Sequence, residues 1–326
     1  MEYRTLRGTG AAISRFCLGT MTFGAQADES ESIRMVHYAL DQGVNFIDTA
    51  DSYNKGLTEA ILGKALEGKR AGVVLASKVY GQVGDYPLRD RGLTRWHILR
   101  GVEASLKRLK TDCLDILFLH HPDPETPLEE SMAACDTLVR QGKVMYYGMS
   151  NFSAWRITQA KWLAERLGLT APVISQNPYN LITRSAELEF FSCCKELQIG
   201  LVVYNPLAGG LLTGKHTAMQ PPAQNTRFQL NQNYYNRYWH EINFKAAAEL
   251  QAIAQQAGLS IVQLALQWVM AQPMVDAAIV GASRMTQLEE NIAAIEGKLE
   301  PEVIAACESA WQMVKGTTFH YCRTGY

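Results

Sequence analysis

Short apolar runs alternate with amphipathic segments along the chain. The apolar runs predict eight strands, which are FCLGT from residue 16, NFID from 45, VVLASKV from 73, DILFLH from 115, VMYYGMS from 144, VISQ from 173, GLVVYN from 200 and AAIV from 277. Segments with helical spacing follow them; in one, Ile98, Val102, Leu106 and Leu109 share a face. Eight strand–helix units in regular order favour an α/β fold, a closed (β/α)8 TIM barrel, over an open doubly wound sheet.

Two segments depart from this repeat. Residues 3–17 alternate around RGTG and predict a β-hairpin that closes the bottom of the barrel. Residues 215–240, after the seventh strand, form a polar segment far longer than the usual βα loop of about 2–6 residues. It carries Lys215, Arg227 and Arg237 but no acidic residue, so we expect a lid over an anion, with an ordinary surface loop as the alternative. No linker divides the chain, and we expect one domain over residues 1–326.

Composition narrows the class of partner. The chain has 31 basic and 32 acidic residues and a net charge of −1, which gives no reason to expect nucleic acid or an anionic membrane as partner. No apolar run approaches a membrane span of about 20 residues, so we expect a soluble, cytoplasmic protein. The seven cysteines are scattered and form no C-x-x-C pair, which is typical of reduced, buried thiols. The motif G-x-G-x-x-G is missing, which argues against a Rossmann nucleotide site.

Four polar residues mark the ends of successive strands. Asp48, Lys78 and His120 end apolar runs, and Tyr53 follows Asp48 by five residues. In a parallel barrel these positions share the rim that carries the chemistry. A tyrosine is a weak acid, with a pKa near 10, and a nearby ammonium lowers that pKa. Taken singly, each residue has a structural explanation, but together they predict a site for hydride transfer to a carbonyl, with Tyr53 as proton donor.

The roles of the other three follow from their chemistry. Lys78 would supply the ammonium, and Asp48 would hold Lys78 through an ion pair. The imidazole of His120 would hydrogen-bond the carbonyl oxygen and help to stabilise developing negative charge.

The segments that carry these residues resemble a known family. GVNFIDTADSYN, ASKV and LFLHHPD are similar to the three segments that hold the catalytic tetrad of the aldo-keto reductases, and the resemblance covers residues 3–315. It implies that Asp48, Tyr53, Lys78 and His120 are catalytic. Met21 stands where many members have tryptophan, Val280 replaces a common proline, and the tail FHYCRTGY, of a kind that often shapes substrate choice, matches nothing in the family pattern.

The resemblance also implies a cofactor, NADPH/NADP+. Side-chain amides and hydroxyls of Ser150, Asn151 and Gln176 would hold the nicotinamide carboxamide. Tyr204 would stack on the nicotinamide, and the backbone near Gly209 would approach the pyrophosphate. The full set of expected cofactor residues is Gly19, Thr20, Met21, Ser150, Asn151, Gln176, Tyr204, Asn205, Leu207, Gly209, Lys215, Gly281, Ser283, Arg284, Gln287, Glu290 and Asn291.

The last part of that set decides between two nucleotides. Ser283, Arg284 and Gln287 match the residues that bind the 2′-phosphate, near a helix N-terminus suited to phosphate, while Glu290 and Asn291 match those near the adenine. Arg284 favours NADPH, because a guanidinium binds a phosphate and an NADH site has little use for it. The alternative is a helix with a capping serine and an exposed arginine.

Three functional hypotheses follow. The first is an NADPH-dependent reductase of aldehydes or ketones, with a small-molecule carbonyl as its partner. The second is an NADP(H)-binding, redox-sensing subunit that resembles the potassium-channel β subunits. The third is a metal-dependent hydrolase that uses His120, His121 and Asp123. It is disfavoured because adjacent histidines on a strand point to opposite faces, and we expect no metal. The side chains expected to line the substrate pocket are Phe23, Tyr80, His121 and Tyr235, and the oligomeric state is not predicted.

Overall fold

The computed structural model describes residues 1–87, 89–216, 220–224 and 226–316. The tail FHYCRTGY, residues 319–326, lies outside these ranges. The chain divides into two compact units. The first comprises Met1–Asn177, Cys193–Val202 and Asp276–Glu289, and the second comprises Pro178–Ser192, Val203–Val275 and the described chain from Glu290 onward. The expectation of a single domain stays a prediction.

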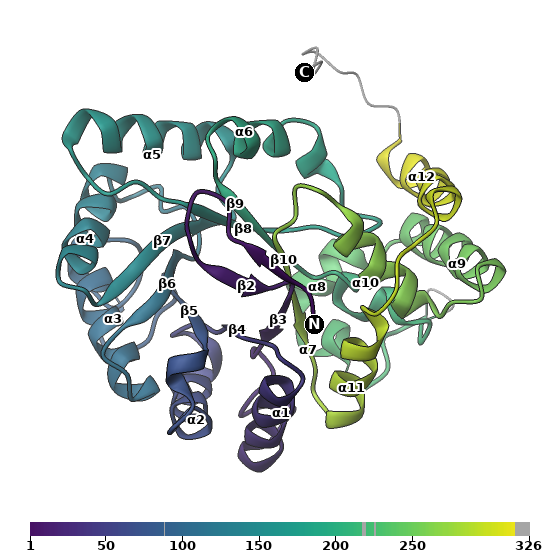
Figure 1. Cartoon of the computed structure of the whole chain (residues 1–326), viewed down its shortest axis with the longest axis horizontal. Coiled ribbons are helices and arrows are strands. Elements are labelled where there is room, and N and C mark those ends of the chain that lie inside the picture. The colour runs from purple at the N-terminus through teal and green to yellow at the C-terminus, as the bar shows by residue number, and fades with distance from the viewer. Residues whose placement is uncertain (88, 217–219, 225, 317–326) are drawn as a thin grey trace. The chain divides into compact units, whose positions relative to one another are not determined.

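Eight parallel strands form a closed barrel, as the alternation of apolar runs predicts (Figure 1). In spatial order they are β10 (Ala277–Gly281), β3 (Phe16–Gly19), β4 (Phe46–Asp48), β5 (Val74–Val79), β6 (Leu114–Leu119), β7 (Val144–Ser150), β8 (Ile174–Pro178) and β9 (Gly200–Tyr204). Barrel strands are covered on both faces, and for this reason they form nearly continuous apolar runs. The prediction of a (β/α)8 barrel is confirmed.

The register of the first strands sets the position of the polar residues. Asp48 of β4 pairs with Ala76 of β5, and Lys78 of β5 pairs with Phe118 of β6. Because the strands are parallel, the polar ends of β4, β5 and β6 reach the same end of the barrel. This end is the carboxyl end, where barrel enzymes carry their active sites.

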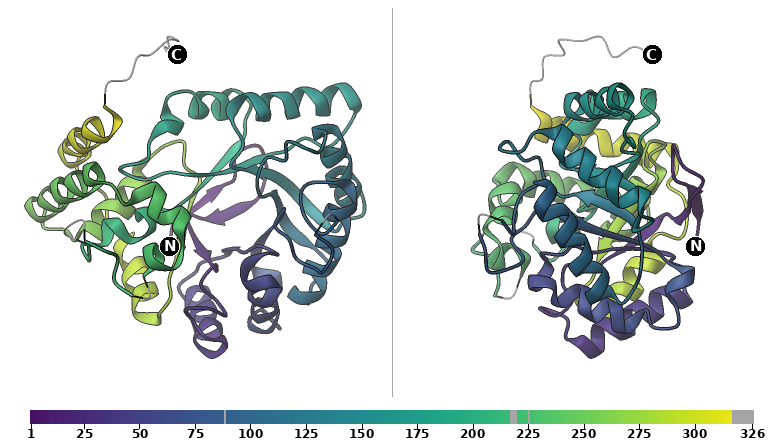
Figure 2. Two further views of the ribbon diagram at one scale, coloured as in Figure 1. Left: turned by 180° about the vertical axis from the view of Figure 1, so that it is seen from behind. Right: turned by 90° about the vertical axis from the view of Figure 1, so that its left-hand side faces the viewer.

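A two-stranded hairpin precedes the barrel. Its strands are β1 (Tyr3–Thr5) and β2 (Ala12–Ser14), paired antiparallel. Tyr3 Oη donates to the carbonyl of Gly43 at 2.6 Å, and Ser14 N donates to Asn45 Oδ1 at 2.6 Å. Gly43 and Asn45 directly precede β4, so the hairpin lies against the amino end of the barrel, as expected (Figure 2). It is shorter than the predicted residues 3–17, because Phe16 already begins β3.

The helices of the first unit follow the strands along the chain and lie outside them (Figures 1 and 2). They include α1 (Glu29–Asp41), α2 (Leu57–Ala65), α3 (Arg95–Leu109), α4 (Leu128–Arg140) and α5 (Ala154–Leu167). Two further helices each cross a boundary between the units, namely α6 (Phe190–Glu196) and α11 (Met285–Ala294). Side chains cap several N-termini: Asp28 accepts from the amide of Glu31, and Thr94 accepts from that of His97. No helix in the described part of the chain is long and apolar enough to cross a membrane.

The second unit is largely helical. Its helices are α7 (Arg227–Leu230), α8 (Gln232–Tyr238), α9 (Glu241–Gln256), α10 (Ile261–Ala271) and α12 (Pro301–Lys315). The prediction of a loop over residues 215–240 was therefore wrong in part, because α7 and α8 lie within it. Asn231 caps α8 by accepting from Asn233 and Tyr234, and the buried rings of Phe228 and Trp239 are 4.7 Å apart. This cap and this aromatic contact fold a segment that looks uniformly polar in sequence.

The pairing of β7 with β8 leaves no room for a side chain at Gly148. A Cβ atom there would lie 2.2 Å from the carbonyl oxygen of Ile174 and 2.4 Å from its Cγ2. We expect Gly148→Ala to lower the free energy of unfolding by about 1–3 kcal/mol, as overpacking of a core typically does. Urea unfolding would measure this. Gly72→Ala is the control, because an added Cβ there meets nothing within 4 Å; equal losses in the two variants would contradict the close contact.

Candidate active site

The structure brings the four predicted catalytic side chains together. Asp48 ends β4, Lys78 lies near the end of β5, His120 directly follows β6, and Tyr53 begins a short 3-10 turn, η1 (Tyr53–Gly56). Lys78 Nζ lies 2.5 Å from Asp48 Oδ1 and 3.3 Å from Tyr53 Oη. The rings of Tyr53 and His120 meet edge to face with centroids 6.1 Å apart. A phenol, an ammonium, a carboxylate and an imidazole thus lie close together at one end of the barrel.

Lys78 is the centre of this arrangement. Its side chain is fully buried, and Nζ donates to Asp48, to the carbonyl of Thr49 at 2.7 Å and to Tyr53. These contacts match the three donors of an ammonium. Burial lowers the pKa of Lys78, but the Asp48 carboxylate more than offsets it, and the pKa is raised above its usual value. Lys78 therefore keeps its positive charge next to the phenol at all physiological pH values.

Asp48 is held from a second direction. Its Oδ2 accepts from Gln176 Nε2 at 2.8 Å, and its backbone carbonyl accepts from Thr20 Oγ1 at 2.9 Å. Burial raises the pKa of Asp48, while the hydrogen bonds from Lys78 and Gln176 oppose that effect. Gln176 was expected to bind a nicotinamide carboxamide. In this structure its side-chain NH2 group orients Asp48.

A strained turn presents Tyr53. Asn54 and Lys55 have φ angles of 47° and 55°, a left-handed conformation that costs free energy in residues other than glycine. Asn54 Nδ2 donates to the carbonyl of Phe23 at 2.7 Å and thereby stabilises the turn. The side chain of Phe23 is fully buried, so the expectation that it lines a substrate pocket was wrong. Sequence reasoning also missed Asn54, although asparagine is one of the few residues that tolerate this conformation.

Contacts from two neighbouring strands fix His120. Its amide donates to the carbonyl of Val79 at 3.1 Å, and its own carbonyl accepts from Asn151 Nδ2 at 2.9 Å. Burial lowers the pKa of His120 well below its usual value, and the charges of Lys78 and His121 add to this effect. The imidazole is therefore neutral at pH 7.

The two adjacent histidines stack on each other. The ring centroids of His120 and His121 are 4.8 Å apart at an interplanar angle of 16°, and Tyr80 meets His121 edge to face at 5.4 Å. The expectation that the two rings point to opposite faces was wrong, because β6 ends at Leu119 and the alternation of a strand ends with it. Asp123, the third residue of the metal hypothesis, accepts hydrogen bonds from Leu93 N and Thr126 Oγ1. Within the described ranges, no group of three His, Cys, Asp or Glu side chains could hold a metal ion.

The residues expected to hold a carboxamide form a connected group. Ser150 Oγ donates to the carbonyl of Gln176 at 3.0 Å and accepts from Asn151 Nδ2 at 3.0 Å. Asn151 N donates to the carbonyl of Gln176 and to Asn177 Oδ1, both at 3.0 Å. The group thus joins the carboxyl ends of β7 and β8, and through Asn151 it reaches the backbone of His120.

The expected phosphate-binding residues follow β10 in the first unit. Gly281 ends the strand, and both the amide and the hydroxyl of Ser283 donate to Gln287 Oε1, at 2.9 and 3.0 Å. Arg284 is exposed. One contact was not foreseen: the amide of Met285, at the start of α11, donates to Glu31 Oε1 of α1 at 2.8 Å. Nothing in the sequence of the phosphate segment signals this carboxylate, because Glu31 is far away along the chain.

The first barrel strand leads into this region from the other side. A Cβ atom at Gly19 would lie 2.7 Å from Ile279 Cγ2, so this glycine permits the close pairing of β3 with β10. Thr22 Oγ1 donates to the carbonyl of Ala282 at 2.5 Å. Thr20 is buried and Met21 is half-buried between these positions.

The other expected cofactor residues belong to the second unit, namely Tyr204, Asn205, Leu207, Gly209, Lys215, Glu290 and Asn291. Tyr234 of α8 donates to Asn205 Oδ1 at 3.1 Å, and the Arg237 guanidinium lies 5.8 Å from the Tyr234 ring. Burial raises the pKa of Tyr204 to about 12, against the effect of Arg237. Within this unit α8 therefore packs beside Asn205. Tyr235, an expected pocket wall, stacks on Trp239 with centroids 5.9 Å apart.

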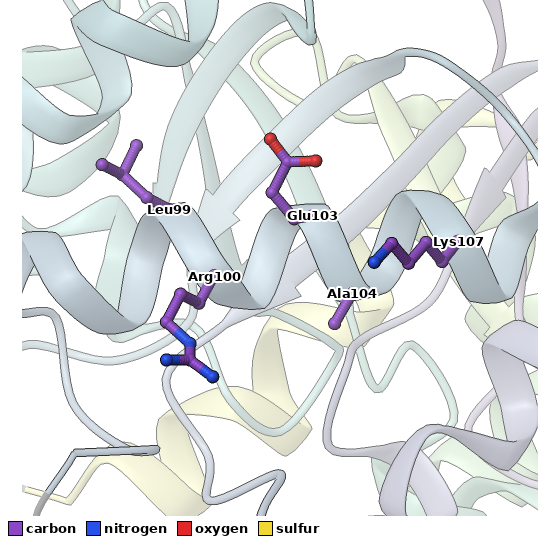
Figure 3. A pocket seen from close by; sticks show the side chains of 5 residues that line it. All are labelled: Leu99, Arg100, Glu103, Ala104 and Lys107. Carbon is purple, nitrogen blue, oxygen red and sulfur yellow. The ribbon is translucent and has the colours of Figure 1, made fainter.

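A surface groove along α3 is separate from these residues. Figure 3 shows the side chains that line it, which are Leu99, Arg100, Glu103, Ala104 and Lys107. They are spaced along the helix surface, and Glu103 forms an ion pair with Lys143. The groove contains no member of the predicted site, and its solvated charges offer no acid–base pair comparable to Tyr53 and Lys78.

Comparison with known proteins is consistent with this geometry. The model of the Aldo/keto reductase family matches residues 15–312. The uncharacterized oxidoreductase YrpG of Bacillus subtilis is 40% identical over 314 residues, which cover 93% of this chain and 94% of that protein. A probable voltage-gated potassium channel subunit beta of Oryza sativa subsp. japonica is 36% identical over 330 residues, covering 98% and 100%.

A human relative has an enzymatic name. Aflatoxin B1 aldehyde reductase member 2 of Homo sapiens is 35% identical over 324 residues, which cover 94% of this chain and 89% of that protein. The family match spans most of the chain and includes every strand of the barrel. The chain therefore belongs to the aldo/keto reductase family and is an oxidoreductase of the kind that acts on carbonyl groups.

Proposed function

We propose that the chain is an NADPH-dependent reductase that converts aldehydes or ketones to alcohols. The observation that carries the proposal is the position of Lys78 Nζ, which lies 3.3 Å from Tyr53 Oη and is held there by Asp48 and the Thr49 carbonyl. A fixed ammonium beside a phenol stabilises the phenolate that remains after the proton leaves. This makes Tyr53 a suitable proton donor.

The remaining catalytic roles follow from charge and geometry. Tyr53 Oη donates the proton that the carbonyl oxygen takes up as the alcohol forms. His120 is neutral, so its imidazole carries one N–H donor that orients the carbonyl oxygen and stabilises its developing charge. Asp48 stays next to Lys78 and keeps the ammonium in place. His121 and Tyr80, in edge-to-face contact, are candidate walls for the substrate.

The residues present suit a nicotinamide dinucleotide. Ser150 and Asn151 carry hydroxyl and amide groups, which suit a carboxamide because it both donates and accepts hydrogen bonds. In this structure the Ser150 hydroxyl donates to the Gln176 carbonyl, and Asn151 Nδ2 donates to the His120 carbonyl and to Ser150 Oγ. In the second unit, taken by itself, Asn205 Nδ2 is buried and makes no hydrogen bond with any described residue. When bound, the nicotinamide supplies the hydride that reaches the carbonyl carbon.

Arg284 supports NADPH over NADH. Its guanidinium is exposed next to Ser283, and a guanidinium binds phosphate through paired, charge-assisted hydrogen bonds. Glu31 disfavours a phosphate at this helix start, because its carboxylate already accepts from the amide of Met285. We expect the exposed arginine to dominate, since Glu31 is itself paired with Arg34 at 2.9 Å.

A second candidate function is an NADP(H)-binding regulatory subunit. Two plant relatives are named as probable potassium channel β subunits, and they are 36% identical to this chain. The tetrad does not exclude this function, and NADPH binding without reduction of any carbonyl would favour it. A cytoplasmic location stays a prediction from the sequence.

Replacement of the proton donor tests the proposed reaction. We expect Tyr53→Phe to lower kcat for carbonyl reduction by at least about 100-fold, because positioned acids contribute roughly 10²–10⁴-fold. NADPH affinity should stay nearly unchanged. Absorbance of NADPH would measure turnover, and fluorescence titration would measure binding. Tyr86→Phe, at an exposed tyrosine, is the matched control. Full activity of Tyr53→Phe would remove Tyr53 as the acid.

The protonation state of His120 can be observed directly. Since burial lowers its pKa well below the usual value, we expect the ring to stay neutral down to about pH 6, where an ordinary histidine is largely charged. Long-range ¹H–¹⁵N NMR spectra of the imidazole groups would follow this, with His120→Gln for assignment. A titration midpoint at or above about 6.5 would contradict the neutral role.

The cofactor preference depends on Arg284. We expect Arg284→Leu to weaken NADPH binding by about 10- to 100-fold, the equivalent of one or two charge-assisted hydrogen bonds, and to leave NADH binding unchanged. Dissociation constants for the two nucleotides would check this. Arg91→Leu removes the same charge from another exposed position and serves as control. Equal losses for NADPH and NADH would show that Arg284 does not bind the 2′-phosphate.

A further inference from the structure

A second group of ionisable side chains is buried next to the Tyr53 turn. Glu59 of α2 is 0% exposed, and Asp51, which follows β4, is 1% exposed. Arg108 of α3 reaches this group, with its Nη2 2.7 Å from Glu59 Oε2. The proposed reaction uses none of these three residues, yet buried charges are costly unless they are compensated.

Glu59 is fully compensated. Its Oε2 accepts from Arg108 Nε at 2.8 Å, and its Oε1 accepts from Ser77 Oγ at 2.5 Å. Arg108 Nη2 also donates to Ser105 Oγ at 3.2 Å. The guanidinium therefore neutralises one carboxylate, that of Glu59. The pair also reaches the catalytic region, because Ser77 directly precedes Lys78.

Asp51 has no comparable compensation. Neither of its carboxyl oxygens makes a hydrogen bond of ordinary geometry with any residue in the described ranges. The carboxyl group faces α3, since a methyl group added to Gly101 would lie 3.8 Å from Asp51 Oδ2 and 3.9 Å from His97 Cε1. A buried carboxylate without a partner is strongly unfavourable, and such a group takes up a proton instead.

The charged groups around Asp51 also favour its protonated form. The titratable and charged groups that face it are Glu59 on α2, Arg108 and His97 on α3, and Lys78 on β5. Burial, followed by the Glu59 carboxylate, raises the pKa of Asp51 to about 8, and these effects outweigh the opposing effects of Arg108, of the Ser52 backbone amide and of Lys78. Burial also lowers the pKa of His97, so this imidazole is neutral and offers Asp51 no positive charge at pH 7.

Backbone contacts connect Asp51 to the catalytic side chains. Its amide donates to the carbonyl of Lys78 at 3.1 Å, and the amide of Tyr53 donates to the carbonyl of Ala50 at 3.2 Å. Asp51 therefore lies within the turn that presents the phenol. If Asp51 lost its proton, a second carboxylate would act on Lys78, and the positive field at Tyr53 would weaken.

We propose that Asp51 is held as a neutral carboxylic acid at pH 7 and acts as a positioning residue that preserves the charge and placement of the Tyr53–Lys78 pair. The catalytic part of this inference rests on the proposed reductase function. The neutral state itself rests on the burial of Asp51 beside Glu59, because the Arg108 guanidinium pairs with Glu59 and leaves Asp51 without a cation in hydrogen-bond contact. The group acts through Lys78 and Tyr53 and does not touch the substrate.

Asp51→Asn tests the proposal, because asparagine keeps the shape and cannot ionise. We expect this variant to keep kcat/KM within about threefold of wild type at pH 7. Above about pH 8, wild-type kcat/KM should fall by on the order of tenfold with an inflection that the variant lacks, since one pKa unit of interaction corresponds to tenfold. Asp112→Asn, the same change at an exposed position, should keep the wild-type profile.

Glu59→Gln provides a second, independent variant. It removes the neighbouring negative charge and leaves Arg108 to pair with Asp51, so the inflection should move to lower pH. Identical pH profiles for wild type and Asp51→Asn would overturn the proposal. A loss of more than about tenfold at pH 7 in Asp51→Asn, with Asp112→Asn unaffected, would also overturn it, because the charged form would then be the active one.

Unfolding separates this inference from the proposed function. The carboxyl group binds its proton in the folded chain and loses it in the unfolded chain above about pH 4, so its contribution to stability falls as pH rises from about 4 to about 8. The urea concentration at the midpoint of unfolding should therefore fall more for wild type than for Asp51→Asn as the pH rises from about 4 to about 8. Above about pH 8 the two midpoints should change equally with pH. Parallel midpoints throughout would overturn the neutral state. If wild type reduces no carbonyl, the proposed function fails, and this comparison still decides the protonation of Asp51.

Discussion

The buried ion pair between Asp48 and Lys78 is the interaction on which the rest of the site depends. Two opposite charges taken out of water are stable only when good geometry and further hydrogen bonds replace the lost hydration. Here the carbonyl of Thr49, the phenol of Tyr53 and the amide of Gln176 provide those bonds. Removal of one partner from such a pair typically costs about 3–5 kcal/mol. The pair therefore holds β4, β5 and β8 in one arrangement, and the position of the phenol follows from it.

The same principle extends outward from the pair, because contacts to other elements also hold the other side chains that we propose to be catalytic. Asn151 after β7 fixes the backbone of His120 after β6, and Asn54 anchors the Tyr53 turn to the carbonyl of Phe23. Catalytic groups need such support, since small displacements lose much of the rate. The strained conformation at Asn54 belongs to this support: the surrounding contacts maintain it, and it sets the direction in which the phenol points.

The barrel, and the grouping of Asp48, Tyr53, Lys78 and His120 at one end of it, could be predicted from the sequence because each leaves a local signal. A strand buried on both faces is a continuous apolar run, and a polar residue at its end, such as Lys78, is conspicuous. The Asp51–Glu59–Arg108 group leaves no such signal, because an acid that will be buried looks like any other acid, and Arg108 is 49 residues from Glu59. The stacking of His121 on His120 depends on where β6 ends, which a pattern fixes only to within a residue or two.

The contact between Glu31 and the amide of Met285 joins residues 254 positions apart in the chain. Two helices therefore determine the electrostatic potential at the start of α11, and only one of them carries the segment that we propose to bind phosphate. A codon change at position 31 would alter the charge there while residues 281–291 stayed identical. Proteins with identical residues 281–291 can for this reason differ in charge at this helix start, and classification by that segment alone would assign them to the same group.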